Sequence, residues 1–421
     1  MALWIVVAVG VTILAVLLII NASSRQRSVE RPIAHLYDCT DPQFVRAMGS
    51  LLGPALLGGN RVTPLVNGDR IFPAMLGAIR GARRSITFET FIYWSGEIGR
   101  EFAEALAERA RAGVAVHVML DWVGTGKIDD ELIRQMETAG ATVLKYHPLR
   151  WYNLGRLNNR THRKLLIVDG EVGFTGGVGI ADVWRGDGQD PEHWRDTHFR
   201  VEGPVVGQMQ AAFMDNWIET RSEVLHGEHY FPALRSVGPH CGQMFQSSSD
   251  GGSESVRLMY LMSIAAASRS IRISNAYFVP DDLAVELLVE ARRRNVEVEI
   301  VVPGPHIDAR AVRRASRSRW GPLLEAGVAI YEFQPTMYHT KVMIVDDCWV
   351  SVGSTNFDSR SFRLNDEANL NVLDGELTAE LTRHFEADKE RSRRVTLEMW
   401  RARPWHQKLK ERLAGLFRSQ L

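Results

Sequence analysis

The sequence predicts an α/β protein built from two copies of one unit and preceded by a single transmembrane helix. Three observations lead to this prediction. The stretch His162–Asp169, HRKLLIVD, returns later in the chain as His339–Asp346, HTKVMIVD. Around each copy, segments of helical spacing alternate with short β-branched runs in the same order. The chain also begins with a run of 19 uncharged residues, from Ala2 to Ile20.

Length and composition indicate a globular protein of two domains. A chain of 421 residues exceeds one ordinary core, and 45% apolar with 24% charged residues excludes a disordered chain. Fifty basic residues balance fifty acidic ones, so the chain lacks the net positive charge that supports non-specific binding of nucleic acids. No nucleic-acid partner is therefore expected. Cys39, Cys241 and Cys348 show no metal-ligand spacing, which predicts no metal site, no disulfide framework and a reducing compartment.

The uncharged run at the N-terminus predicts a membrane anchor. At 1.5 Å per residue it spans about 28 Å, close to the hydrocarbon thickness of a bilayer. A cleaved signal peptide is the alternative, but it has basic residues before a shorter apolar core. Here Arg25, Arg27 and Arg31 follow the run instead. We therefore expect a single-pass protein of the cell (inner) membrane whose main folded body lies on the cytoplasmic side.

The two halves are expected to share one order of elements. In the first half, helices at 72–84 and 99–114 alternate with strands at 85–94 and 115–124. In the second half, helices at 254–270 and 281–296 alternate with strands at 271–281 and 297–304. The resulting division is an anchor at 1–24, a juxtamembrane connector at 25–60, domains at 61–240 and 241–395, and a basic amphipathic tail at 396–421.

The repeated stretch has the residue types needed for phosphoryl transfer. In an extended strand, residues two apart project from the same face, so His162 and Lys164 point together, as do His339 and Lys341. Lysine neutralises a phosphoryl oxygen while histidine does the chemistry. One pair supplies a nucleophile but no acid for the leaving alcohol. Two pairs facing each other supply both, with a phosphohistidine as the intermediate.

Each repeat continues into small residues that let backbone amides approach a phosphate. The first repeat has Gly176-Gly177-Val178-Gly179, and the second has Gly353-Ser354-Thr355-Asn356. The paired HxKxxxxD pattern with these tails is similar to the phospholipase D superfamily. Stretches such as FPAMLGAIRGARRSITFETFIYW and HTKVMIVDDCWVSVGSTNFDSRSFRLNDEANL resemble bacterial cardiolipin synthases in particular.

The resemblance implies two phospholipase D-type α/β domains around one shared active site. The implied reaction transfers a phosphatidyl group between two phosphatidylglycerol molecules, giving cardiolipin and glycerol with no cofactor. The implied partners are phosphatidylglycerol and other anionic phospholipids. Two alternatives stay open: a phospholipase D-type hydrolase, in which water replaces the second lipid, and a catalytically poor membrane scaffold.

The resemblance also implies the site residues. The catalytic set is His162, Lys164, Asp169, His339, Lys341 and Asp346; the phosphate-binding set is Gly177, Ser354 and Asn356; and the acids that orient the histidines are Asp196 and Glu367. We expect the two motif aspartates to be structural more than catalytic, because each lies in a turn five residues beyond its lysine. Gly179 departs from the family, which often has asparagine there. Analogy assigns His162 as the nucleophile and His339 as the acid/base, while the two motifs themselves leave open which histidine has which role.

Three further features allow two interpretations each. The helical spacing of Arg310, Arg313, Arg314 and Arg317 suits a solvated basic face or a surface that gathers anionic headgroups. The apolar stripe Trp405, Leu409, Leu413, Leu416 and Phe417 suits a helix in the membrane interface or one docked on the body. A loop with Trp151, Tyr152 and Leu154 suits either the interface or the core.

Overall fold

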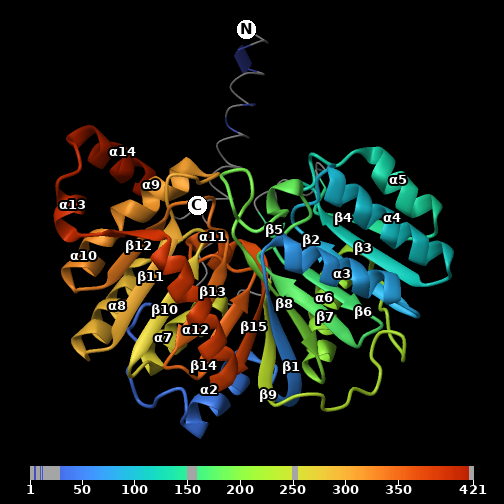
Figure 1. Ribbon diagram of the computed structural model, residues 1–421, viewed down its shortest axis with the longest axis horizontal. Coiled ribbons are helices and arrows are strands. Elements are labelled where there is room, and N and C mark those ends of the chain that lie inside the picture. The colour runs from blue at the N-terminus through green and yellow to red at the C-terminus, as the bar shows by residue number, and fades with distance from the viewer. Residues whose placement is uncertain are drawn as a thin grey trace.

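The structure is a computed structural model that describes residues 4, 5, 10, 12, 29–148, 159–248 and 255–416. Two α/β halves lie side by side and share one continuous mixed sheet (Figure 1). The prediction of an α/β fold is therefore confirmed.

The strands of the two halves follow the same spatial order. In the first half this order is β1-β8-β7-β6-β2-β3-β4, and in the second it is β9-β15-β14-β13-β10-β11-β12, with β16 (Ser392–Val395) added at the edge. Antiparallel pairing of β1 with β9 joins them. The first-half strands are β1 Leu57–Val66, β2 Ser85–Thr90, β3 Ala115–Asp121, β4 Thr142–Tyr146, β6 Leu165–Val168, β7 Val172–Gly176 and β8 Thr197–Glu202. The second-half strands are β9 His240–Ser247, β10 Ser270–Asn275, β11 Glu297–Pro303, β12 Ala329–Phe333, β13 Lys341–Val345, β14 Trp349–Gly353 and β15 Asn365–Leu373.

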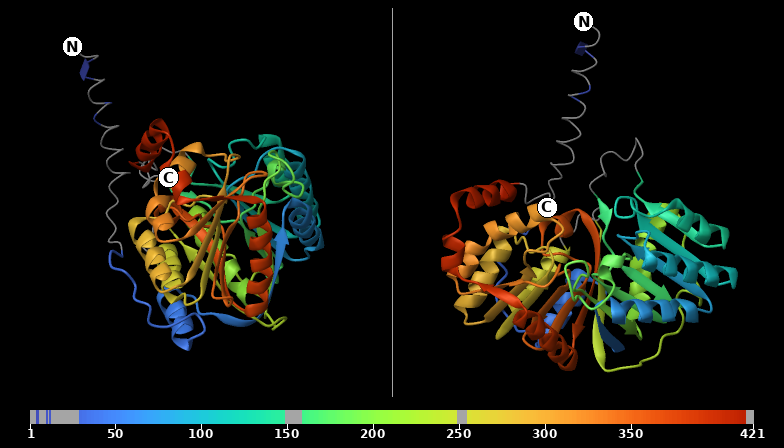
Figure 2. Two further views of the ribbon diagram at one scale, coloured as in Figure 1. Left: turned by 60° about the vertical axis from the view of Figure 1, so that its left-hand side comes forward. Right: turned by 45° about the horizontal axis from the view of Figure 1, so that its top comes forward.

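Helices cover both faces of each half, as the views in Figures 1 and 2 show. The outer face of the first half carries α3 (Gly68–Gly81), α4 (Glu97–Arg111) and α5 (Asp130–Thr138). The equivalent face of the second half carries α7 (Ser255–Ala266), α8 (Asp282–Arg293) and α10 (Trp320–Glu325). On the other face, α6 (Val205–Arg221) and α12 (Gly375–Glu390) pack over one apolar cluster that includes strands of both halves.

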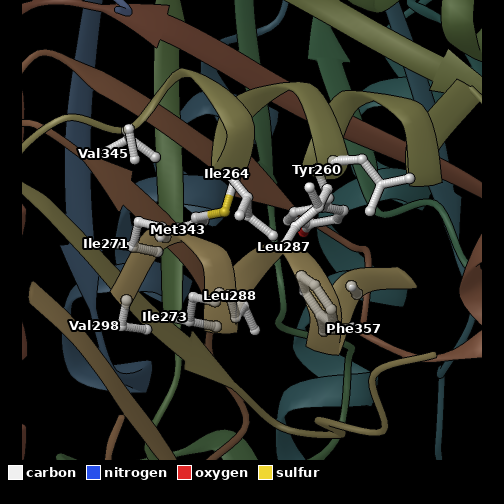
Figure 3. Packing of buried hydrophobic residues seen from close by; sticks show 14 of the residues in the cluster. Tyr260, Ile264, Ile271, Ile273, Leu287, Leu288, Val298, Met343, Val345 and Phe357 are labelled. Atoms are coloured by element: carbon white, nitrogen blue, oxygen red, sulfur yellow. The ribbon is translucent and has the colours of Figure 1, made fainter. Parts of the chain in front are cut away.

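Burial of apolar helix faces explains this layering. In the second half, Ile264 of α7 and Leu288 of α8 pack on Ile271 and Met343 of the sheet (Figure 3). The residues at both ends of α8 stabilise this helix. The Asp281 side chain accepts a hydrogen bond from the Ala284 N–H at the start, and basic residues occupy the last turn. The predicted strands at 85–94 and 271–281 end earlier, at Thr90 and Asn275. Beyond these points the chain turns from the sheet and makes single bridges, Tyr93 with Ile180 and Phe278 with Phe357.

The expected connector is part of the folded body. It contains α2 (Pro42–Leu52), and its apolar side chains pack into the core of the second half. Cys39 there is fully buried and forms a disulfide with Cys348 in the turn between β13 and β14. This bond departs from the expectation that the chain has no disulfide framework and belongs to a reducing compartment. A separation of 309 residues leaves no local spacing that could have indicated the bond.

The structure does not test the predicted anchor. Within the described residues, no helix is long and apolar enough to cross a membrane. The predicted span, 1–24, falls almost wholly outside those residues, so the anchor stays a prediction. The loop with Trp151, Tyr152 and Leu154, and also Phe417, lie outside them as well.

Candidate active site

Two short parallel pairings bring the halves together at the site. Thr161 of β5 (Arg160–Thr161) pairs with Asp366 of β15, and Arg195 pairs with Tyr338. Each pairing joins one half to the other, and the two pairings use equivalent positions of the duplicated halves. The residue after each pair is a histidine on one strand and a carboxylate on the other. Each histidine therefore lies beside an acid from the opposite half.

His162 lies beside Glu367. Its Nδ1 is 3.0 Å from both carboxylate oxygens of Glu367, and its backbone N–H donates to the Asp366 carbonyl at 2.9 Å. The hydroxyl of Ser354 donates to Glu367 and holds the carboxylate from behind. Phe91 packs edge-on against the imidazole at 5.2 Å between ring centroids. This arrangement fixes the ring and leaves Nε2 for chemistry, because Nδ1 faces the acid.

His339 lies beside Asp196 in the same way. Its Nδ1 is 2.7 Å from Asp196 Oδ2, and its backbone N–H donates to the Arg195 carbonyl at 2.8 Å. The indole N–H of Trp184 donates to the same Asp196 oxygen at 3.0 Å. A Cβ at Gly177 would lie 2.3 Å from the other oxygen of Asp196, so only glycine fits there. Gly177 thus makes room for this carboxylate.

The two lysines lie with the histidines. Lys164 Nζ donates to the His162 carbonyl at 2.8 Å, and Lys341 Nζ lies 3.1 Å from both ring nitrogens of His339. All four side chains are buried, with at most 8% of each residue exposed. Within the described residues they form one compact basic group that two carboxylates hold.

Burial shifts the pKa values of this group. It lowers the pKa of His162 to about 4, against the opposing effect of Glu367. It lowers the pKa of Lys164 to about 7 and that of Lys341 to about 8, again against nearby carboxylates. Burial and then Lys341 lower the pKa of His339. Lys341 of the second half also lowers the pKa of His162 and of Lys164, so the charges of the two halves act within one site.

These pKa shifts indicate that the site is suited to binding an anion. Burial disfavours cations, and a bound phosphodiester would supply the negative charge that restores the ammonium forms of both lysines. For the acids, burial would raise the pKa, but the adjacent imidazoles and lysines outweigh it. The pKa values of Asp196 and Glu367 consequently lie below their usual range.

The two motif aspartates do not reach the histidines. Asp169 and Asp346 follow strands β6 and β13, whereas the histidines precede these strands. Seven residues of nearly extended chain span roughly 20 Å. Asp169 instead accepts backbone N–H bonds from Arg83, Arg84 and Ser85. These contacts support the structural role that we expect for the two motif aspartates from their places in turns.

We expect an Asp346→Asn change to lower stability and to spare chemistry. Asp346 accepts N–H bonds from Ser268, Arg269 and Ser270 at 2.6–2.9 Å, and losing part of this set should cost about 1–3 kcal/mol. Denaturant unfolding measures the loss, and activity per folded molecule should stay within about twofold. The neighbouring exposed Asp347, changed to Asn, is the matched control. Lost activity with unchanged stability would instead place Asp346 in the chemistry.

The positions expected to bind phosphate differ in whether they have a polar group free to contact it. The Ser354 hydroxyl donates its hydrogen bond to Glu367, and Gly177 provides the space that the Asp196 carboxylate occupies. Asn356 is 4% exposed, and its Oδ1 has no hydrogen-bond partner among the described residues. A Cβ at Gly179 would lie 2.9 Å from that of Ile92, so this position of the first half has no room for an asparagine. Only the second half therefore offers a side-chain amide here.

Sequence reasoning missed two buried acids beside the site. Burial raises the pKa of Asp121 and of Asp358 to about 6. Asp121 ends strand β3, and its charge acts on Lys164; Asp358 caps α11 (Ser359–Arg363), and its charge acts on Lys341. A carboxylate at the end of a buried strand was the available signal for Asp121. Nothing local marked Asp358.

The comparisons with known proteins agree with this geometry. The family model described as "Cardiolipin synthase, PLD-like domain" matches residues 260–389. Cardiolipin synthase 2 of Bacillus anthracis is 34% identical over 350 residues, which cover 82% of this chain and 68% of that protein. Cardiolipin synthase A of Pseudomonas fluorescens is 33% identical over 378 residues, covering 88% and 77%.

A solved structure shares the fold. The phosphatidylserine synthase of Haemophilus influenzae superposes with a TM-score of 0.69 and covers 90% of this chain and 99% of its own. At 12% identity, this likeness concerns the fold alone.

Proposed function

The chain belongs to the bacterial cardiolipin synthase family of phospholipase D-like proteins, and from this premise we propose that it transfers a phosphatidyl group between two phosphatidylglycerol molecules. The crossed pairing of each histidine with a carboxylate of the other half carries the proposal. Such a site supplies a nucleophile and an acid at once, together with two ammonium groups for the phosphoryl oxygens.

In the first step, Nε2 of His162 attacks the phosphorus of phosphatidylglycerol. A P–N bond forms as the P–O bond to the glycerol headgroup breaks, and His339 gives a proton to the departing oxygen. Glu367 accepts the Nδ1–H of His162 and stabilises the charge that develops on this ring. Lys164, Lys341 and the amide of Asn356 are the groups that contact the phosphoryl oxygens. The intermediate is a phosphatidyl-histidine.

In the second step, a hydroxyl of another phosphatidylglycerol gives its proton to His339 and attacks the phosphorus. The P–N bond breaks, and cardiolipin leaves. One phosphodiester is exchanged for another, so the reaction needs no energy source and runs backwards when glycerol is abundant. Asp196 holds His339 in the tautomer that both proton transfers require.

The membrane is the expected place of this reaction. The run Ala2–Ile20 and the arginines that follow it support a single-pass anchor with the catalytic body on the cytoplasmic side. Both substrates would then reach the site from the inner leaflet.

The direct test is to incubate the purified full chain with phosphatidylglycerol alone and to identify the products by mass spectrometry. Cardiolipin with glycerol is the expected result. Phosphatidic acid with glycerol would mean that water is the acceptor and would make the protein a hydrolase. Unchanged lipid across several donors would favour a scaffold and overturn the proposal.

Activity should depend on pH as a bell-shaped curve. The value of kcat/KM should rise as pH passes about 4, because His162 must lose its proton to attack. It should fall as pH rises, first because His339 loses the proton that it must give to the leaving group, and burial lowers the pKa of His339 below its ordinary value. A further fall is expected above about pH 7–8, because Lys164 and Lys341 then lose the charges that bind phosphate. A pH series with phosphatidylglycerol vesicles measures both limbs.

The Lys164→Arg variant tests the assignment of the upper limb. Its rate should be lower, because arginine does not fit a lysine site well. The part of the decline near pH 7 should weaken, because arginine keeps its proton, while the decline that His339 sets should stay in place. An unchanged decline near pH 7 would contradict the role of Lys164.

A further inference from the structure

Helices α9 (Arg310–Ser318) and α14 (Trp405–Leu416) pack against each other at one edge of the second half (Figure 1). The contact is made through the polar side of α14. Glu411 is 1% exposed and pairs with Arg317 at 3.2 Å and with Arg403 at 2.9 Å. Ala414 packs beside Val312. The helix is thus docked on the body, but through its polar side and not through the apolar stripe that the sequence offered for docking.

Docking leaves the apolar stripe of α14 in solvent. Trp405, Leu409, Leu413 and Leu416 are 74%, 49%, 51% and 76% exposed. At 3.6 residues per turn they lie on one side of the helix, opposite the side that carries Glu411 and Ala414. A helix of a soluble body normally buries its apolar stripe and exposes its polar side. Here the arrangement is inverted, so the stripe is available to another apolar phase.

A basic pocket of about 290 Å³ lies between the two helices, next to this stripe. Arg313 and Arg317 in its wall are neutralised by the buried carboxylate of Glu332, at 2.6 and 2.8 Å, and Arg317 also by Glu411. Three other cations of the wall, Arg310, Arg314 and Lys410, are exposed and have no acidic partner within the described part of the chain. The pocket therefore has an unbalanced positive charge.

We propose that the pocket between α9 and α14 is a second, non-catalytic site that binds the headgroup of an anionic phospholipid while the stripe enters the acyl region beside it. Arg310, Arg314 and Lys410 would contact the phosphate, and Trp405 would lie at the interface, where tryptophan is enriched. Basic and apolar groups side by side suit a lipid surface. A soluble phosphorylated partner has no use for an exposed stripe of three leucines and a tryptophan.

The pocket also lies close to the active site along the chain. Asp308, just before α9, accepts a hydrogen bond from the Tyr277 hydroxyl at 2.6 Å, and its charge acts on His339 and Lys341. A lipid held at α9 would keep this edge of the second half on the bilayer. The inference goes beyond the proposed reaction and does not rest on it.

The test uses the full chain with an environment-sensitive fluorophore on Leu409→Cys. Cys241→Ser removes the free cysteine, and His162→Ala prevents consumption of the lipid. The protein is reconstituted in vesicles in which phosphatidylglycerol replaces phosphatidylcholine stepwise. We expect a blue shift that grows with phosphatidylglycerol content. In Arg310→Ala/Arg314→Ala/Lys410→Ala, half of the maximal shift should need at least about tenfold more phosphatidylglycerol.

The matched control is Arg70→Ala/Arg80→Ala/Arg100→Ala, which removes three exposed cations from the first half and should respond like the parent. Equal melting temperatures of both triple variants show that each is folded. The proposal is overturned if pure phosphatidylcholine gives the full shift, if the α9–α14 variant responds like the parent, or if inorganic phosphate without vesicles produces the shift. Because the probe protein lacks His162, none of these results bears on the transfer reaction.

Discussion

A His339→Ala protein should accumulate a phosphatidyl group on His162 when the donor carries a leaving group that needs no proton. With phosphatidylglycerol, loss of the general acid should slow transfer by about 10²–10⁴-fold. With a nitrophenyl phosphatidyl ester, the first step needs only the nucleophile, while the second step still lacks its base. The covalent intermediate should therefore build up, and mass spectrometry of the peptide that contains His162 would detect it.

The reciprocal variant distinguishes the two histidines. His162→Ala should form no adduct with the same ester and should lose transfer by at least about 10⁴-fold. His226→Ala, in an exposed loop, is the control and should react like the parent. An adduct on His339 in the His162→Ala protein would exchange the two roles. Absence of an adduct in every variant would contradict covalent catalysis.

Replacing the two crossed carboxylates should give different defects although each change removes one charge. Glu367→Gln leaves His162 without the acceptor of its Nδ1–H, so adduct formation with the nitrophenyl ester should fall by about 10²–10⁴-fold. Asp196→Asn acts on His339 and should spare that adduct, but should slow transfer from phosphatidylglycerol to a similar extent. Rapid-quench kinetics with both donors measures the difference.

This pair of variants tests the crossing itself. If each acid served the histidine of its own half, Glu367→Gln would spare the adduct and Asp196→Asn would abolish it. Glu171→Gln is the control, because Glu171 lies on the surface and pairs only with Arg84 in the described structure. A unit charge lost there should change the rates little.

The duplication and the catalytic residue types follow from local sequence. Buried strands and amphipathic helices have periods that a short window reveals, so the order of elements is predicted well in both halves. The pairs His162 with Lys164 and His339 with Lys341 are also local, because two residues along an extended chain face one side. The family predicted from these motifs is confirmed by relatives at 33–34% identity over most of the chain.

Which acid serves which histidine depends on contacts that no local window contains. The pairings of Asp366 with Thr161 and of Arg195 with Tyr338 cross between the two halves, which β1 and β9 join. The same holds for the disulfide of Cys39, whose partner lies 309 residues away.

The side of α14 that meets the body is a further case. Hydrophobic periodicity locates its apolar stripe, but the docked side is set by the buried carboxylate of Glu411 between Arg317 and Arg403. Periodic burial within one element can be inferred from sequence, because neighbouring residues share it. Contacts between distant segments cannot, because they depend on how whole layers pack, and here that packing decides the crossed site and the exposed face of α14.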